Sequence, residues 1–235
     1  MMLDEIMNHL QQLGHENIKK IFRNHGAREP FYGVKVEDLK KIQKKVKFNY
    51  ELSKELFCTG NTDAMYLAGL IAEPEKMTKA DLQEWAEKAY WYMLSEFTVP
   101  WVASENPLGT ELALKWIESD KENISSCGWA TLASIVAIND NKLIDYNLHK
   151  GLLDRVSKTI HMEKNRVRYA MNNFVIALGG YCPHLSEDAI KTASVIGKVK
   201  VDMGGTACKV PDAAEYIKKM HNRGLLSRKR KSARC

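Results

Sequence analysis

The chain has 235 residues, of which 45% are apolar and 27% are charged, which is the composition of an ordinary globular protein. This composition excludes collagen-like and intrinsically disordered chains. No stretch approaches 18 uncharged apolar residues, so we expect no helix that spans a membrane. Only 14 Gly and six Pro are present, and a β-sandwich or barrel would need more turn residues than this. The composition therefore favours helices.

The net charge of +6 is concentrated at one end of the chain. Residues 218–235 contain eight Lys or Arg side chains and no carboxylate, so the rest of the chain is slightly acidic. A basic tail on a nearly neutral body is typical of an arm that binds a polyanion. A solvated, disordered tail has the same composition, and the charge pattern leaves both interpretations open.

The cysteines and histidines indicate no metal site and no disulfide framework. Five cysteines are widely spaced without a C-x-x-C pair, and the seven histidines lack metal-ligand spacing. An odd number of scattered cysteines predicts reduced thiols in a cytoplasmic protein. The acidic, amphipathic segment 1–14 does not have the pattern of a signal peptide. We expect no metal and no cofactor.

Apolar residues recur every three or four positions along almost the whole chain, which predicts helices joined by short loops. In chain order, we expect helical stripes at 3–10, 18–22, 36–46, 52–57, 62–71, 82–94, 110–118, 125–138, 145–160 and 163–178, then one after 186 and a last one at 211–221. Residues 98–109 hold two prolines and allow only short helical turns. The one β-like signal is the KVKV run at 198–201.

Three local signals mark helix ends. Asn61 is placed to cap the helix that follows it, and Thr78 with Asp81 resembles a capping box. Pro211 at the first position of the last helix, with Gly224 beyond its end, is the usual asymmetry of helix termini.

Helices rich in small residues recur at intervals of roughly 30–40 residues, at 64–72, 128–138 and 168–180, with a short turn near Trp101 between the first two. This period favours an all-α, HEAT-like helical-repeat superhelix, an α-α solenoid, over a globular bundle. We expect one solenoid domain at 1–224 and a basic tail at 225–235. Its predicted core includes Ala68, Leu70, Leu132, Ile135, Val175 and Ile176.

Two groups of residues are candidates for a site. Trp101 lies on irregular backbone beside a proline and is expected to present an exposed stacking face, with Glu96 and Glu105 nearby to favour a cationic ligand. Arg166 and Arg168 begin a helix, where the dipole disfavours them. A bound anion or a salt bridge to Glu163 or a neighbouring helix would explain these arginines equally well.

Three stretches resemble bacterial DNA alkylation repair proteins built from HEAT-like repeats, whose glycosylase members are of the AlkD type. They are FYGVKVEDLKKIQKKV (31–46), VRYAMNNFVIALGGY (167–181) and IGKVKVDMGGTACKVPDAAEYIKK (196–219). The resemblance implies a superhelix whose basic concave cleft holds duplex DNA by its backbone. It also implies excision of cationic N3- and N7-alkylated purines, by aromatic and carboxylate groups that stabilise the developing sugar cation.

The chain departs from the glycosylase pattern at its centre. The W-x-x-x-D element of these enzymes falls at Glu96 to Pro100, their arginine near Trp129 and their later tryptophan near Asn173. Glu96, Glu105 and Trp101 are the residues that would have to substitute as catalytic groups. Whether the chain is an enzyme, a DNA-alkylpurine N-glycosylase, therefore stays open.

The leading hypothesis is a monomeric protein that binds double-stranded DNA, alkylated or branched, in a basic cleft and has no membrane partner. The expected DNA contacts are Trp129, Arg166, Arg168, Asn173, Lys198, Lys200, Arg228, Lys229, Arg230 and Lys231. The alternatives are a non-catalytic recogniser of damaged or branched DNA and a helical-repeat scaffold for protein partners. The missing Trp and Asp favour the recogniser over the enzyme, and the basic tail argues against the scaffold.

Overall fold

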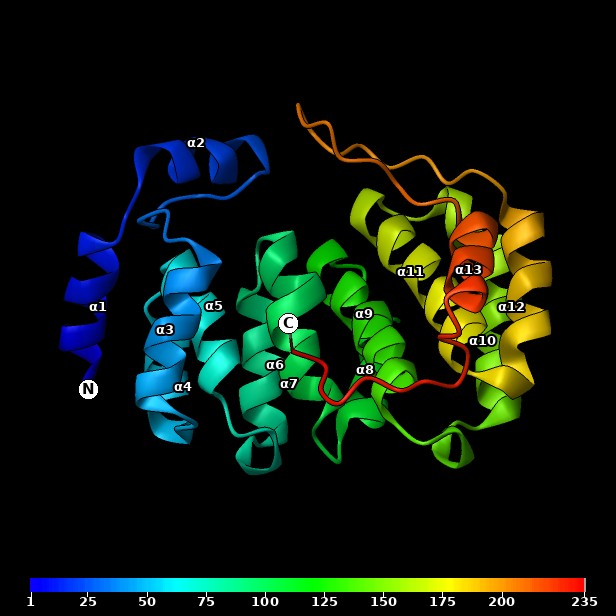
Figure 1. The fold of residues 1–235 in the computed structure, drawn as a ribbon, viewed down its shortest axis with the longest axis horizontal. Helices are drawn as coiled ribbons and strands as arrows, with labels where there is room; N and C mark the ends of the chain where they lie inside the picture. The colour runs from blue at the N-terminus through cyan, green and yellow to red at the C-terminus, as the bar shows by residue number, and fades with distance from the viewer. Residues whose placement is uncertain (235) are drawn as a thin grey trace.

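The computed structural model describes residues 1–234, and these form a row of α-helices without any β-strand (Figure 1). The α-helices are α1 (Leu3–Gln12), α2 (Glu16–Asn24), α3 (Val36–Val46), α4 (Tyr50–Cys58), α5 (Thr62–Ile71), α6 (Lys79–Lys88), α7 (Val99–Ser104), α8 (Gly109–Trp116), α9 (Glu122–Ile138), α10 (Tyr146–Thr159), α11 (Asn165–Tyr181), α12 (Pro183–Ile196) and α13 (Ala213–Asn222). The short turns are η1 (Pro74–Lys76), η2 (Leu94–Thr98), η3 (Asn141–Leu143) and η4 (Ile160–Met162), of which η2 is a π-helix. The predicted all-α repeat architecture is confirmed.

Side-chain caps begin the helices where the sequence predicts them. The Asn61 side chain accepts hydrogen bonds from the first backbone amides of α5. Thr78 and Asp81 form the predicted capping box of α6. The expectation for Pro211 is wrong, because Asp212 is the N-cap of α13 and accepts from Glu215 N, so the proline lies before the helix.

The expected long helix at 82–94 is broken. Helix α6 ends at Lys88, and the π-helix η2 follows. Between them, the Tyr90 hydroxyl donates to the Arg28 carbonyl oxygen and Trp91 Nε1 donates to the His25 carbonyl oxygen, both at 2.7 Å. These bonds to distant residues hold the chain out of the helical path, which local periodicity does not reveal.

Neighbouring helices pack into two continuous cores. Three pairs of helices pack side by side, namely α4 with α5, α8 with α9, and α11 with α12. A continuous line of packed elements also runs through the molecule, from α5 to η2 and α7, then to α9 and α11. One hydrophobic cluster fills the N-terminal half and a second fills the C-terminal half. All six residues predicted for the core are buried, which confirms that part of the sequence interpretation.

Two irregular segments follow the C-terminal helices and lie across the molecule (Figure 1). The arch, residues 197–212, extends from the end of α12 toward α2. A Cβ atom built on Gly204 would lie only 3.1 Å from the Asn24 carbonyl oxygen, so the arch contacts the end of α2. The strap, residues 225–234, runs from the end of α13 back to the middle of the row. Both segments therefore join repeats that are distant in sequence.

Two further findings concern membrane-spanning helices and the cysteines. No helix within residues 1–234 has the length and apolar character needed to cross a membrane. Cys58, Cys127, Cys182 and Cys208 are free thiols, while Cys235 lies outside the described residues.

Candidate nucleic-acid interface

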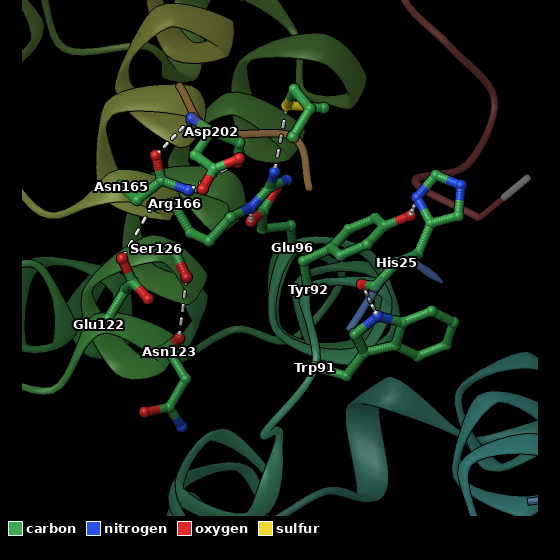
Figure 2. A network of polar contacts seen from close by, with 11 residues as sticks. His25, Trp91, Tyr92, Glu96, Glu122, Asn123, Ser126, Asn165, Arg166 and Asp202 are labelled. Carbon is green, nitrogen blue, oxygen red and sulfur yellow. Dashed lines mark hydrogen bonds and ion pairs between the residues drawn. The ribbon is translucent and has the colours of Figure 1, made fainter. Parts of the chain in front are cut away.

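A buried ion pair between Glu96 and Arg166 lies at the centre of the row of helices (Figure 2). Arg166 Nε donates to Glu96 Oε1 and Arg166 Nη2 donates to Glu96 Oε2, each at 2.6 Å. This is the two-pronged geometry that suits a guanidinium and a carboxylate. The π-helix η2 carries Glu96 and the first turn of α11 carries Arg166. The Glu96 side chain is 3% exposed, so the pair is withdrawn from solvent.

Aromatic rings enclose the arginine of this pair. The Arg166 guanidinium lies 4.6 Å from the ring centroid of Tyr92 and 4.5 Å from that of Tyr169. Burial raises the pKa of Glu96 to about 7, although the hydrogen bonds and charge of Arg166 oppose this rise. The sequence left open whether this arginine binds an external anion or a carboxylate on a neighbouring element. The structure shows that it binds the carboxylate of Glu96.

Further hydrogen bonds connect the ion pair to both halves of the chain (Figure 2). The Arg166 backbone amide donates to Glu122 Oε1 at 2.9 Å. Asn165 exchanges two hydrogen bonds with the backbone of Asp202 in the arch, at 2.7 and 2.8 Å. On the N-terminal side, Trp91 Nε1 donates to the carbonyl oxygen of His25, which follows α2. The network therefore joins α2, η2, α9, α11 and the arch.

A hollow of about 530 Å³ opens beside the ion pair, between α9 and α11. Its lining includes small residues, chiefly Ala130, Ala133, Ala137, Ala170 and Ala177, and the aromatic residues Phe97, Trp101, Tyr169, Tyr181 and Tyr216. The arch contributes Lys209 and the strap contributes Arg230 to its lining. We call this cavity the aromatic hollow.

The structure does not join the three candidate catalytic residues in one open site. Trp101 is only 3% exposed and packs edge-on against Tyr66, so the expectation of an exposed stacking face is wrong. Its helix α7 follows the π-helix η2 directly, so Trp101 lies on helical and not on irregular backbone. Glu96 is held by Arg166, and Glu105 lines a different cavity, where it accepts hydrogen bonds from the strap.

The strap binds to the carboxyl ends of α9 and α7 and, through Arg234, to the C-cap residue Ala72 of α5. Lys229 Nζ donates to the Val136 carbonyl oxygen at 2.7 Å, and the Arg230 backbone amide donates to the Ala137 carbonyl oxygen at 2.8 Å, both in the last turn of α9. Glu105, the C-cap of α7, accepts from Ala233 N at 2.8 Å. Basic groups and amide donors at helix C-termini satisfy otherwise unpaired carbonyl oxygens and complement the dipoles.

Arg234 anchors the far end of the strap. Its Nη2 donates to the Ala72 carbonyl oxygen at 2.9 Å and lies 3.7 Å from Glu105 Oε2. Its guanidinium lies 5.0 Å from the ring centroid of Phe48. Arg228 and Lys231, by contrast, are exposed. The basic residues of this segment thus divide into an anchoring set and a set that faces solvent.

We expect Arg234→Ala to lower the free energy of unfolding by about 1–3 kcal/mol, because it removes a hydrogen bond to a helix-terminal carbonyl and a partner of Glu105. Arg228→Ala is the matched control, since its side chain is exposed and should change stability by less than about 0.5 kcal/mol. Urea denaturation followed by circular dichroism measures both. Equal stabilities of the two variants would contradict the anchoring role.

A second hollow, of about 670 Å³, lies between the start of α11 and the arch, and we call it the cationic hollow. Its lining includes Arg168, Lys198, Lys200 and Lys209. Among the described residues, none of these four cations makes an ion pair, and Arg168 Nε is buried without a hydrogen-bond partner. Asp202 is the one carboxylate among the lining residues, and it accepts from the Gly204 amide instead.

Two predicted DNA contacts have different environments. Trp129 is completely buried against Phe174, at 5.3 Å between ring centroids, so the expectation that it contacts DNA is wrong. Asn173 lines the aromatic hollow. Sequence reasoning missed the tyrosines of that hollow, although Tyr169, Asn173 and Tyr181 recur at multiples of four residues and therefore share one face of α11.

The chain is similar to a known protein family and to a solved structure. Residues 6–217 match the model of a protein family described as DNA alkylation repair enzyme. Uncharacterized proteins of Listeria innocua and Listeria monocytogenes are each 39% identical over 226 residues, covering 94% of this chain and 97% of theirs. A solved structure with 37% identity superposes over the full length of both chains with a TM-score of 0.92. It is described as a new family of proteins related to the HEAT-like repeat DNA glycosylases with affinity for branched DNA structures.

Proposed function

Because this chain belongs to the family of DNA alkylation repair enzymes, we propose that it binds DNA through the phosphate backbone, that it prefers branched DNA to linear duplex, and that it does not excise bases. The site for the phosphates is the cationic hollow and the arch beside it. The exposed residues of the strap extend this surface. We further propose that the protein works in the bacterial cytoplasm.

The observation that carries the proposal is the cluster of four cations in the cationic hollow. Arg168, Lys198, Lys200 and Lys209 line one cavity, and none of them has an ion-pair partner in the described part of the chain. Like charges gathered in this way repel one another and destabilise the folded state. A polyanion would relieve that repulsion, and DNA gains affinity in the same contact by releasing its condensed counterions.

Two considerations support branched DNA over linear duplex. The similar solved structure is described as having affinity for branched DNA structures. The arch and the strap, in addition, contribute Lys209 and Arg230 to the lining of a hollow of about 530 Å³ between α9 and α11. A cavity of this size holds a ligand no larger than one or two nucleotides. A preference for DNA with a local departure from duplex geometry is consistent with this surface.

We expect Lys198→Gln with Lys200→Gln to weaken binding to a four-way DNA junction and to make the salt dependence shallower. Each lost phosphate contact should reduce the slope of log K against log salt by about 0.9. Lys44→Gln with Lys45→Gln is the matched control, because both lysines are exposed on α3 and lie outside the cationic hollow. Fluorescence anisotropy at a series of salt concentrations measures both. The phosphate site would be contradicted if the salt slope did not change in the Lys198/Lys200 variant. It would also be contradicted if the Lys44/Lys45 variant reduced the salt slope equally.

A further inference from the structure

We propose that the aromatic hollow receives an unpaired nucleobase at the branch point of the bound DNA. This inference rests on the proposed function and adds a specific site to it. It concerns recognition of one nucleotide, with no chemical step.

The shape of the hollow suits a flat group. Both helices contribute alanines to its lining, among them Ala133 of α9 and Ala177 of α11, and such small side chains leave room for a flat group. The volume of about 530 Å³ is that of a typical small-ligand cavity. It accommodates a nucleotide and excludes a duplex.

Tyr181 and Tyr216 offer stacking surfaces that no cation of residues 1–234 covers, whereas Arg166 already stacks on the ring of Tyr169. Tyr216 is 46% exposed, and Tyr169 and Tyr181 are partly exposed. Neither Tyr181 nor Tyr216 makes a side-chain hydrogen bond within the described residues. A tyrosine ring gives a nucleobase a large, rigid stacking face whatever the base identity. These rings therefore suit an unpaired base better than they suit solvent.

The rim carries the charge that the backbone of such a nucleotide requires. Lys209 comes from the arch and Arg230 from the strap, the two segments that cross the molecule in Figure 1. Neither side chain pairs with a carboxylate in the described part of the chain. Glu96 also lines the hollow, but Arg166 neutralises it. Phosphates on either side of the inserted base would thus meet cations.

A site for an unpaired base would make the protein prefer branched DNA to linear duplex. In a linear duplex every base is paired and stacked, so insertion would first require extrusion of a nucleotide. The cost is least for a base that is already unpaired, and a branch point that carries an unpaired nucleotide supplies such a base without extrusion. The aromatic hollow then adds affinity for branched DNA to the sequence-independent attraction of the cationic hollow.

The experiment uses four-way DNA junctions with the fluorescent base 2-aminopurine either as one unpaired nucleotide at the branch point or as a paired base in the middle of one arm. We expect the full-length chain to change the emission of the branch-point probe and to leave the arm probe unaltered. Tyr216→Leu should abolish that change and weaken junction binding about five-fold or more. Ala133→Trp, which places a large indole ring in the hollow, should likewise abolish the change in emission and weaken junction binding. Tyr146→Leu is the matched control, because Tyr146 is 45% exposed and lies outside the hollow.

The outcomes separate this inference from the proposed function. Junction binding without a change in the branch-point probe would overturn the base site and leave branched-DNA binding intact. Equal effects of Tyr216→Leu and Tyr146→Leu on junction binding, with both proteins folded by circular dichroism, would also overturn it. Absence of any junction binding by the unaltered protein would overturn the proposed function and the base site together.

Discussion

Replacing Arg166 with methionine should lower the free energy of unfolding by about 3–5 kcal/mol, because it leaves the Glu96 carboxylate buried without its counter-charge. Removal of one member of a buried ion pair costs more than the pair contributes, since the remaining charge is still withheld from water. Urea denaturation of the variant and the unaltered chain above pH 7, where Glu96 of the unaltered chain is ionised, measures the loss.

The loss should depend on pH in a defined direction. Burial already raises the pKa of Glu96 to about 7, and removal of Arg166 takes away the charge that opposes this rise. A carboxyl group whose pKa is higher in the folded than in the unfolded state binds more protons when folded, so stability falls as the pH rises between the two pKa values. The Arg166→Met variant should therefore be least impaired near pH 5 and most impaired above pH 7.

A double variant provides the control. Glu96→Met combined with Arg166→Met replaces the pair by apolar groups, which is often neutral or stabilising. We expect it to recover most of the stability lost in Arg166→Met and to show no comparable pH dependence. If the double variant were as unstable as the single one at every pH, packing of the arginine between Tyr92 and Tyr169 would be the dominant contribution instead.

Release of 7-methylguanine or 3-methyladenine from duplex DNA by this chain should be absent or far slower than in glycosylase members of the family. Pro100 stands where the resemblance to those enzymes places an aspartate, and Glu96 stands where it places a tryptophan. Loss of one electrostatic contact to a transition state costs about 10²–10³ in rate. The two carboxylates that could replace this contact already have partners in the chain. Glu96 pairs with Arg166, and Glu105 accepts a hydrogen bond from the strap.

A single-turnover assay on a duplex with one alkylated purine measures this release, and junction binding by the same preparation serves as the positive control. Robust release that disappears in Glu96→Gln or Glu105→Gln would contradict the prediction and identify the catalytic carboxylate. Release that survives both substitutions would indicate a catalytic group elsewhere in the chain.

The sequence predicted the features of the fold that depend on neighbouring residues. Helix positions follow from apolar spacing, and the caps at Asn61 and Thr78 depend on residues three positions away or fewer. The small-residue helices at a regular interval predicted the repeat architecture. In each case the interaction responsible is local, so its signal lies within one stretch of sequence.

The candidate site depends on contacts that no local pattern records. Arg166 meets Glu96 across 70 residues, and Glu105 accepts from Ser232 across 127 residues. Trp101 packs against Tyr66, 35 residues earlier in the chain, and is buried, whereas the proline beside it indicated exposure. The charge of the basic tail is the same whether its cations anchor the strap, as Arg234 does, or remain free for a ligand, as Arg228 does.

The strap changes how this repeat protein should unfold. Repeat arrays are held by contacts between adjacent units, so their ends can open while the middle stays folded. Arg234, however, bonds to the Ala72 carbonyl oxygen 162 residues earlier in the chain, and Lys229 and Arg230 hold α9 between these two points. The hydrogen bond between Arg234 and Ala72 therefore closes a loop of chain that contains most of the repeat array. The repeats inside this loop should exchange their amide protons together, as one cooperative unit, while α1 outside it exchanges earlier.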